Sequence, residues 1–278
     1  MAMLTQQEVN RLLSERIPAE RAWKSTVNIV VLQNKQLAQH GSGSLYRVGN
    51  ESFLVTAGHV VEQALRHGCA MGLSGSDGRY VAIEGESINS KESVDVSAVR
   101  LSDRVVEKLI GCTFLTMNDV SLTTDLSQGI FTLFGYPAIW VKDDGEIMDL
   151  KRFQFTSYAF EGDPSVLDGF DGRFHFLVNG QLIELTEDDG TQVQFKKQDG
   201  SPARFPKDLG GISGCPVWKI ADLPAIRCGE PGEGPRLVGV QTGVYSACMK
   251  ATRWAVVNGL IVNRYPELKP VLSMWRGK

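Results

Sequence analysis

Gly211-Ile212-Ser213-Gly214-Cys215-Pro216 is a short stretch in which glycines stand on both sides of a serine and a proline follows. Glycine permits backbone conformations and close approaches that a side chain would forbid. Such a turn can expose one hydroxyl group and leave backbone N–H groups free beside it. A nucleophile and an oxyanion hole are two of the three parts that acyl transfer needs. The third part is a base, which the rest of the chain must supply.

One of the four histidines has the sequence context of a base. His59 follows the apolar run Phe53-Leu54-Val55-Thr56-Ala57-Gly58, which predicts a buried strand that ends at an imidazole. Asp95 stands at the head of a second predicted strand, residues 94–101. The order along the chain is therefore His, Asp, Ser. Chymotrypsin has this order, whereas subtilisin and the α/β-hydrolases have others.

Four segments in the correct order carry a resemblance to one family. The chain resembles the trypsin-like, chymotrypsin-fold serine peptidases, in particular their bacterial type. The segments are Thr56-Ala57-Gly58-His59, Asp95-Val96-Ser97-Ala98-Val99-Arg100-Leu101, Gly211-Ile212-Ser213-Gly214-Cys215-Pro216 and Leu237-Val238-Gly239-Val240-Gln241-Thr242-Gly243. The resemblance extends over about residues 25–260, which is most of the chain.

The resemblance implies an all-β protein with two six-stranded antiparallel β-barrels and a cleft between them. It assigns His59 and Asp95 to the first barrel as general base and orienting acid. It assigns Ser213 to the second barrel as nucleophile, with the backbone N–H groups of Gly211 and Ser213 as oxyanion hole. A wall of the primary specificity pocket would come from Gln241, Thr242 and Gly243. No cofactor and no metal are implied.

Ile212 departs from the pattern of the family, and Lys207 and Asp208 leave the substrate preference open. Animal members have aspartate where this chain has Ile212, and that aspartate pairs with a new N-terminus after zymogen cleavage. Isoleucine cannot form the ion pair, so we expect a preformed site or one controlled by a partner or a loop. Lys207 and Asp208 precede Ser213 by six and five residues. By counting, Lys207 predicts a preference for acidic substrates and Asp208 one for basic substrates, and the choice stays open.

Composition indicates an ordinary globular protein. Of 278 residues, 42% are hydrophobic and 22% are charged, and the formal net charge of −3 gives no reason to expect a nucleic acid partner. We expect no membrane association, because no run approaches the roughly 18 apolar residues of a membrane span and the first residues do not form a signal peptide. The five cysteines include no CxxC pair. These features predict a cytoplasmic protein with reduced thiols.

Rival sites fit the sequence less well. Cys215 stands where the α/β-hydrolase elbow requires glycine and lies two residues after the serine position, so we predict a small buried thiol there. His40, His67 and His175 are predicted to be surface or packing residues. The sequence offers no ligand cluster for a metal.

Local sequence patterns predict the remaining helices and strands and divide the chain into three parts. The parts are an N-terminal helical extension (1–20), a first barrel (21–118) and a second barrel with a C-terminal helix (119–278). Thr5 and Glu8 form a capping-box pattern for a helix over residues 4–16, whose apolar face is expected to pack on the body of the protein. Strands are predicted at 26–32, 42–48, 52–56, 80–84, 94–101, 129–137, 153–160, 173–178, 182–185, 192–195, 236–242 and 253–257, and a helix interrupted by prolines at 259–272.

The sequence thus predicts a serine endopeptidase that forms an acyl-enzyme on a protein or peptide substrate, with a protein regulator inside the cell as a further expectation. The alternative is a catalytically silent module of the same fold that binds a peptide or a protein partner. An intact set of His59, Asp95 and Ser213 favours the enzyme, because a binding module has no use for all three.

Overall fold

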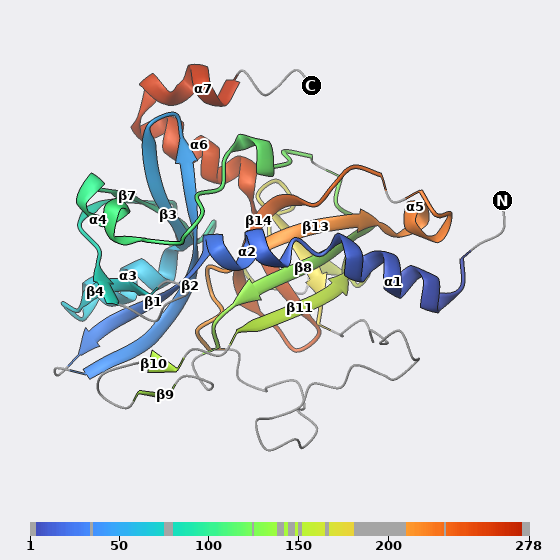
Figure 1. Cartoon of the computed structure of the whole chain (residues 1–278), viewed down its shortest axis with the longest axis horizontal. Coiled ribbons are helices and arrows are strands. Elements are labelled where there is room, and N and C mark those ends of the chain that lie inside the picture. The colour runs from blue at the N-terminus through green and yellow to red at the C-terminus, as the bar shows by residue number, and fades with distance from the viewer. Residues whose placement is uncertain are drawn as a thin grey trace.

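Two antiparallel sheets form the body of the protein, and helices cover its ends (Figure 1). The structure is a computed structural model that describes residues 4–33, 36–74, 80–123, 125–137, 142–143, 148–149, 152–164, 167–180, 210–230 and 232–273. The sheets curl into the two halves of a chymotrypsin-like double barrel, which confirms the predicted fold class. The strands predicted at 182–185 and 192–195 lie outside the described residues, as do Lys207 and Asp208.

The first sheet has seven strands, one more than predicted, in the order β5-β4-β1-β2-β3-β7-β6. Each strand pairs antiparallel with its neighbours. The strands are β1 (Thr26–Gln33), β2 (Gln36–Val48), β3 (Glu51–Ala57), β4 (Ala70–Ser74), β5 (Tyr80–Ala82), β6 (Gly85–Asn89) and β7 (Val96–Leu101). The sequence analysis missed β4 and β6, which are short and contain glycine, a residue depleted in strands.

The second sheet has six strands, in the order β11-β8-β13-β14-β15-β12. They are β8 (Gly129–Gly135), β11 (Phe153–Tyr158), β12 (His175–Asn179), β13 (Pro216–Asp222), β14 (Arg236–Val244) and β15 (Cys248–Arg253). The central strand β13 was not predicted, although it directly follows the serine stretch. A separate short hairpin consists of β9 (Lys142–Asp143) and β10 (Met148–Asp149).

The strand predicted at 253–257 is wrong. β15 ends at Arg253, and helix α6 (Trp254–Arg264) begins at the next residue. Trp254, Val257 and Ile261 recur at helical spacing and are all buried. Tertiary packing of this face therefore outweighs the strand preference of the Val-Val pair. The predicted interruption at the prolines is confirmed, because a 3-10 turn at Pro266–Leu268 separates α6 from α7 (Lys269–Ser273).

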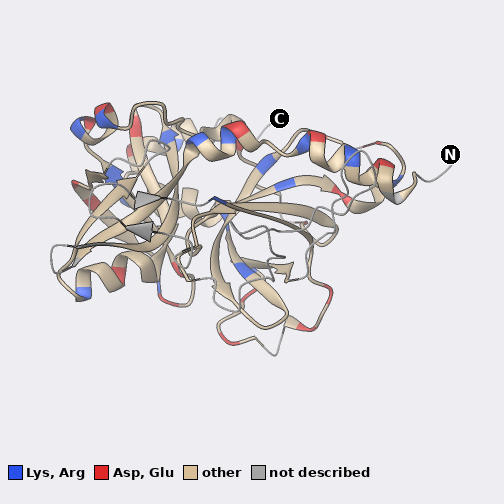
Figure 2. Cartoon of the chain, turned by 60° about the horizontal axis from the view of Figure 1, so that its bottom comes forward, with Lys and Arg blue, Asp and Glu red and all other residues tan. Residues whose placement is uncertain are grey.

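The N-terminal helix packs on the body of the protein, as predicted, with Val9 and Leu13 in the core, and it contacts the second sheet there. Thr5 and Glu8 form the capping box of α1 (Gln6–Arg16), which α2 (Ala19–Ser25) follows. The Arg16 Nε donates a hydrogen bond of 2.7 Å to the carbonyl oxygen of Ile220 in β13. Acidic and basic positions are interspersed along the helix (Figure 2). Shorter helices are α3 (Gly58–Arg66), α4 (Asp103–Lys108), α5 (Leu223–Arg227) and a 3-10 turn at Met117–Asp119.

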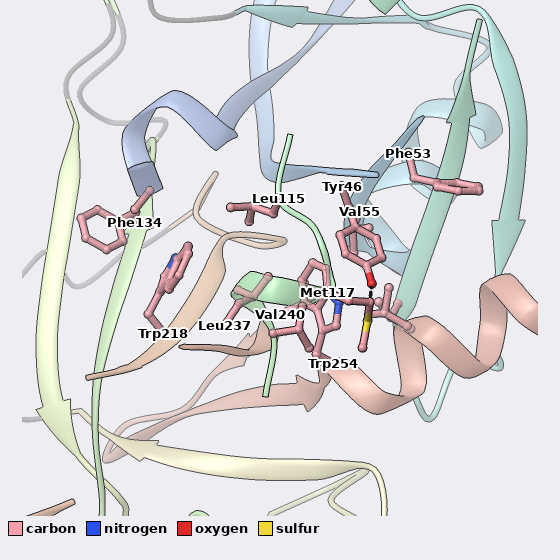
Figure 3. Packing of buried hydrophobic residues seen from close by; sticks show 14 of the residues in the cluster. Tyr46, Phe53, Val55, Leu115, Met117, Phe134, Trp218, Leu237, Val240 and Trp254 are labelled. Carbon is pink, nitrogen blue, oxygen red and sulfur yellow. Dashed lines mark hydrogen bonds between the residues drawn. The ribbon is translucent and has the colours of Figure 1, made fainter. Parts of the chain in front are cut away.

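Three apolar clusters make up the core. One fills the first sheet and one fills the second, while the third and largest joins both sheets to α1 and α6. Figure 3 shows part of this shared cluster, in which Tyr46 packs edge-on against Trp254 with ring centroids 5.2 Å apart. The Tyr46 hydroxyl lies 3.0 Å from the sulfur of Met117. The shared core fixes the two sheets against each other and thus positions any site between them.

Within the described residues, no helix has the length and apolar character that a membrane crossing requires.

Candidate functional site

His59 and Asp95 are brought together by hydrogen bonds. The His59 Nδ1 lies 2.9 Å from Asp95 Oδ2 and 3.1 Å from Oδ1. The backbone N–H of His59 also donates to Oδ1, at 2.8 Å. That N–H belongs to the first turn of α3, where helical N–H groups have no partner within the helix. The carboxylate therefore caps the helix and fixes the ring that the helix carries.

The backbone at this pair is adapted to the contact. Asp95 has φ 55°, in the left-handed region, where aspartate is tolerated better than most residues. A Cβ on Gly58 would lie 3.1 Å from Asp95 Oδ1, so the glycine leaves room for the carboxylate. The Asp95 side chain is 15% exposed and that of His59 is 36% exposed. The pair is thus shielded on the acid's side and open on the side of the imidazole.

The serine stretch forms a tight turn. Gly211 and Gly214 have φ of 90° and 91°, and the N–H of Cys215 donates to the carbonyl oxygen of Ile212 at 2.9 Å. Within the described part of the chain, the N–H groups of Gly211 and Ser213 donate to no other group. Two donors are thus free beside a half-buried serine, as an oxyanion hole requires.

The first sheet holds this turn through Ser42. The Ser42 N–H donates to the carbonyl oxygen of Ser213 at 2.8 Å, and its hydroxyl donates to that of Gly211 at 2.9 Å. The hydroxyl also accepts from the N–H of Tyr136 at 3.0 Å. Gln39 Nε2 is a second donor to Gly211, at 3.1 Å. Sequence reasoning missed Ser42, because one serine in a strand carries no signal of a contact 169 residues away.

Close backbone approaches place Ser213 beside the His59 segment. A Cβ on Gly214 would lie only 2.1 Å from both the Ser42 carbonyl oxygen and Thr56 Oγ1. A Cβ on Gly41 would lie 2.7 Å from Val60, the residue after His59, and 3.2 Å from the carbonyl oxygen of Ser213. Among the described residues the Ser213 hydroxyl makes no hydrogen bond to His59. The structure thus makes the two segments neighbours while leaving the final contact open.

The predicted pocket wall adjoins the same turn. Gln241 of β14 donates its N–H to the Cys215 carbonyl oxygen at 2.9 Å and accepts from the Gly214 N–H at 2.8 Å. Its side chain is buried, and so is the hydroxyl of Thr242. Neither has a hydrogen-bond partner within the described residues. Gly243 follows on the same strand, so the part of β14 that is predicted to line the pocket begins beside the turn that carries Ser213.

The remaining candidates are packing groups. Cys215 is fully buried, which confirms the predicted buried thiol, and burial raises the pKa of this thiol. His40 Nε2 lies 2.7 Å from the Val60 carbonyl oxygen, and burial lowers the pKa of this imidazole. Burial also lowers the pKa of His175, whose Nδ1 accepts from the N–H of Asp171. The exposed His67 makes no contact with the pair in the described structure.

A surface hollow adjoins His59 on the side of α3. Its lining includes Glu62 and Arg66 of α3 together with Ser90 and Lys91, which precede Asp95. Ser90 is a second hydroxyl near His59, but it accepts from the N–H of Val96 at 2.9 Å and donates to the Lys91 carbonyl oxygen at 3.2 Å. Ser90 is thus engaged in local structure. No group of ligands suited to a metal ion exists among the described residues.

Comparison with solved structures supports the fold. The chain is similar to kallikrein-related peptidase 10, with a TM-score of 0.51, 12% identity and coverage of 89% of this chain and 98% of that one. It is also similar to a thermostable serine protease from an extremophilic microorganism (TM-score 0.47, 15% identity, 85% and 93% covered). A protease from M. tuberculosis in its active form gives a TM-score of 0.46 at 14% identity, with 94% and 87% covered. No family model and no curated protein matches the sequence. The likeness to kallikrein-related peptidase 10 shows the chymotrypsin-like fold alone.

Proposed function

We propose that the protein is a serine endopeptidase in which Ser213, His59 and Asp95 form a catalytic triad. The observation that carries the proposal is the double contact between the Asp95 carboxylate and His59, through both the ring Nδ1 and the backbone N–H. A carboxylate in that place keeps the proton on Nδ1 and leaves Nε2 as acceptor. The turn that carries Ser213 lies against the same segment.

Each group has one role in the proposed reaction. Ser213 Oγ attacks the carbonyl carbon of the scissile peptide bond, and its proton passes to His59 Nε2. The negative charge on the carbonyl oxygen is stabilised by the N–H groups of Gly211 and Ser213. His59 then gives its proton to the leaving amine, and the acyl group remains on Ser213. Water, deprotonated by His59, hydrolyses the acyl-enzyme, and no cofactor takes part.

We extend the proposal to a peptidase of the trypsin-like, bacterial type that works in the cytoplasm on protein or peptide substrates. The support is that none of the five cysteines forms a disulfide, as expected in a reducing compartment. Neither a nucleic acid nor a membrane is part of the proposal. A protein regulator is part of it, because the final contact between Ser213 and His59 is not made among the described residues. In the same terms, residues 21–118 and 119–278 are proposed as the two barrel domains.

The missing contact also favours a second candidate function. If Ser213 stays out of reach of His59, the protein is a peptide-binding module with the fold of a peptidase. Hydrogen bonds in catalytic sites are often long before substrate binds, so geometry alone does not exclude the enzyme. The two functions differ in the reactivity of one hydroxyl.

Reaction with a fluorophosphonate, followed by intact mass, tests the proposal. We expect one adduct on the wild type and none on Ser213→Ala or His59→Ala. Ser90→Ala is the matched control, because this serine lies in the hollow beside His59, and it should label like the wild type. An adduct that persists in Ser213→Ala contradicts the assignment of the nucleophile. Absence of any adduct on the folded protein, also with cell extract added, leaves the binding module.

A further inference from the structure

Lys250 is a buried cation in the strand next to the predicted pocket wall. It lies in β15 and pairs in register with Gly243 of β14 and with Leu177 of β12. Its residue surface is only 8% exposed. Within the described residues, no carboxylate forms an ion pair or hydrogen bond with its amino group. A buried charge without a partner is costly, and lysine is rarely buried unless paired.

The side chain of Lys250 lies on the face that is turned toward the proposed triad. Side chains two residues apart in a strand share a face, so Lys250 and Thr252 point the same way. The Thr252 hydroxyl donates a 2.7 Å hydrogen bond to the carbonyl oxygen of Val94, the residue before Asp95. Met249 and Ala251 point the other way, into the core of the second sheet. Lys250 therefore faces the side of the sheet on which Asp95 lies.

Two glycines from separate segments border the side chain. A Cβ on Gly243 would be 3.5 Å from Lys250 Cε, and a Cβ on Gly169 would be 3.6 Å from Nζ. The loop at Gly169 is held by Tyr245, whose hydroxyl donates to the Asp168 carbonyl oxygen at 2.8 Å. The ring of Tyr245 is itself 3.6 Å from a Cβ on Gly243. The two glycines thus leave space beside the side chain of Lys250 and its amino group.

The distance along β14 can be covered by an acidic substrate side chain and the Lys250 side chain together. Gln241 is hydrogen-bonded to both residues that follow Ser213, and Gly243 lies two positions further on. Two residues of a strand span roughly 7 Å. An acidic side chain that leaves the scissile residue at Ser213 and runs along Gln241 and Thr242 therefore points toward Gly243, the strand position opposite Lys250, whose own side chain covers the remaining distance.

We infer that Lys250 is the specificity-determining residue of this site and pairs with the carboxylate of an aspartate or glutamate on the acyl side of the scissile bond. The inference rests on the proposed function and adds to it the substrate class. The substrate carboxylate would supply the anion that the amino group of Lys250 lacks within the described residues. The alternative of a preference for basic residues, which Asp208 predicts by counting, is excluded by the same inference, because a second cation would be repelled.

Peptide substrates with one varied residue on the acyl side test the inference. With aspartate, asparagine, glutamate, glutamine, lysine or leucine there, we expect kcat/KM to be at least tenfold higher for each acid than for its amide. Lys250→Met removes the charge at similar volume and should abolish that preference, with the amide substrates altered less than threefold. Lys250→Arg should retain it. Lys219→Met is the matched control, because Lys219 of β13 is already paired with Asp222 at 2.6 Å.

A binding measurement separates this inference from the proposed catalysis. In the Ser213→Ala background, a peptide that ends in aspartate should bind at least tenfold more tightly than one that ends in asparagine, and Lys250→Met should remove the difference. If the wild type labels with fluorophosphonate but prefers basic or apolar residues, the inference is overturned and the peptidase stands. If nothing labels but the binding difference is present, the inference stands and the peptidase fails. Equal binding of both peptides overturns the inference in either case.

Discussion

The His59–Asp95 pair and the Ser213 turn are held in place in different ways. Three hydrogen bonds join the pair, and all lie within the first sheet and the helix that follows it. The turn, in contrast, belongs to the second sheet but takes bonds from Ser42 and Gln39 of the first. The pair is therefore a local structure, whereas the turn depends on how the two sheets meet. Changes at the interface should move the serine and leave the pair intact.

Asp95→Asn should give the largest effect and test whether the pair is local. Asparagine tolerates the left-handed backbone and still accepts from the His59 N–H, so the fold should persist. Its amide would donate to Nδ1, and the proton would move to Nε2, which could then no longer accept from Ser213. We expect kcat to fall about 10⁴-fold. Steady-state kinetics and urea unfolding measure the two effects, with Asp119→Asn, at the ion pair with Arg21, as control.

If Asp95→Asn loses enough folding stability to account for its loss of kcat, the His59–Asp95 pair is not a local structure. Asp119→Asn should show the reverse pattern, with reduced stability and an unchanged kcat.

Gly214→Ala should break the turn and spare the pair. The added Cβ would meet backbone and hydroxyl oxygens at 2.1 Å, and φ is 91°. We expect a loss of about 3 kcal/mol or more in the free energy of unfolding, together with loss of fluorophosphonate labelling. Gly111→Ala is the control, because φ is 77° there and nothing lies within 4 Å of the added carbon. Its backbone strain should cost only about 1–2 kcal/mol. Equal losses at the two glycines would contradict the close packing of the turn.

Ser42→Ala should sharpen the comparison with a smaller change. It removes a donor to the Gly211 carbonyl oxygen and leaves the buried N–H of Tyr136 without its acceptor. We expect a loss of about 1–3 kcal/mol in stability and slower labelling of Ser213, with the NMR signal of the His59 ring proton unchanged. Ser74→Ala is the matched control, since the buried Ser74 hydroxyl has no partner in the described structure. A shift of the His59 signal in Ser42→Ala would show that the two regions are coupled.

Lowering the pH should have the smallest effect, and it should act on both sheets. Burial lowers the pKa of His40 in the first sheet and, with help from Lys250, that of His175 in the second. The unfolded chain takes up these protons below its histidine pKa of about 6.5 and the folded chain does not, so stability should fall as pH drops below that value. Urea unfolding at several pH values should show a shallower slope for His175→Gln.

Features that depend on a local sequence pattern could be predicted, whereas contacts between segments far apart in the chain could not. An apolar run ending at His59 and a glycine-bounded serine predict a strand end and a turn, and both are present. Ser42 and Lys250 were not predicted, because the contact of Ser42 with Gly211 and the pairing of Lys250 with β12 join segments far apart in the chain. Trp254 begins a helix within a stretch that reads equally well as a strand, and the shared core decides between the two.

Ile212 gives the serine turn an unusual thermodynamic character. The side chain is fully buried in the apolar cluster of the second sheet, where an ion pair would fasten the turn in animal members of the family that it resembles. Apolar burial is insensitive to ionic strength and weakens on cooling, whereas ion pairs are screened by salt. The contribution of Ile212 to the order of this turn should therefore withstand high salt and decline in the cold, whereas that of an ionic latch would weaken in salt.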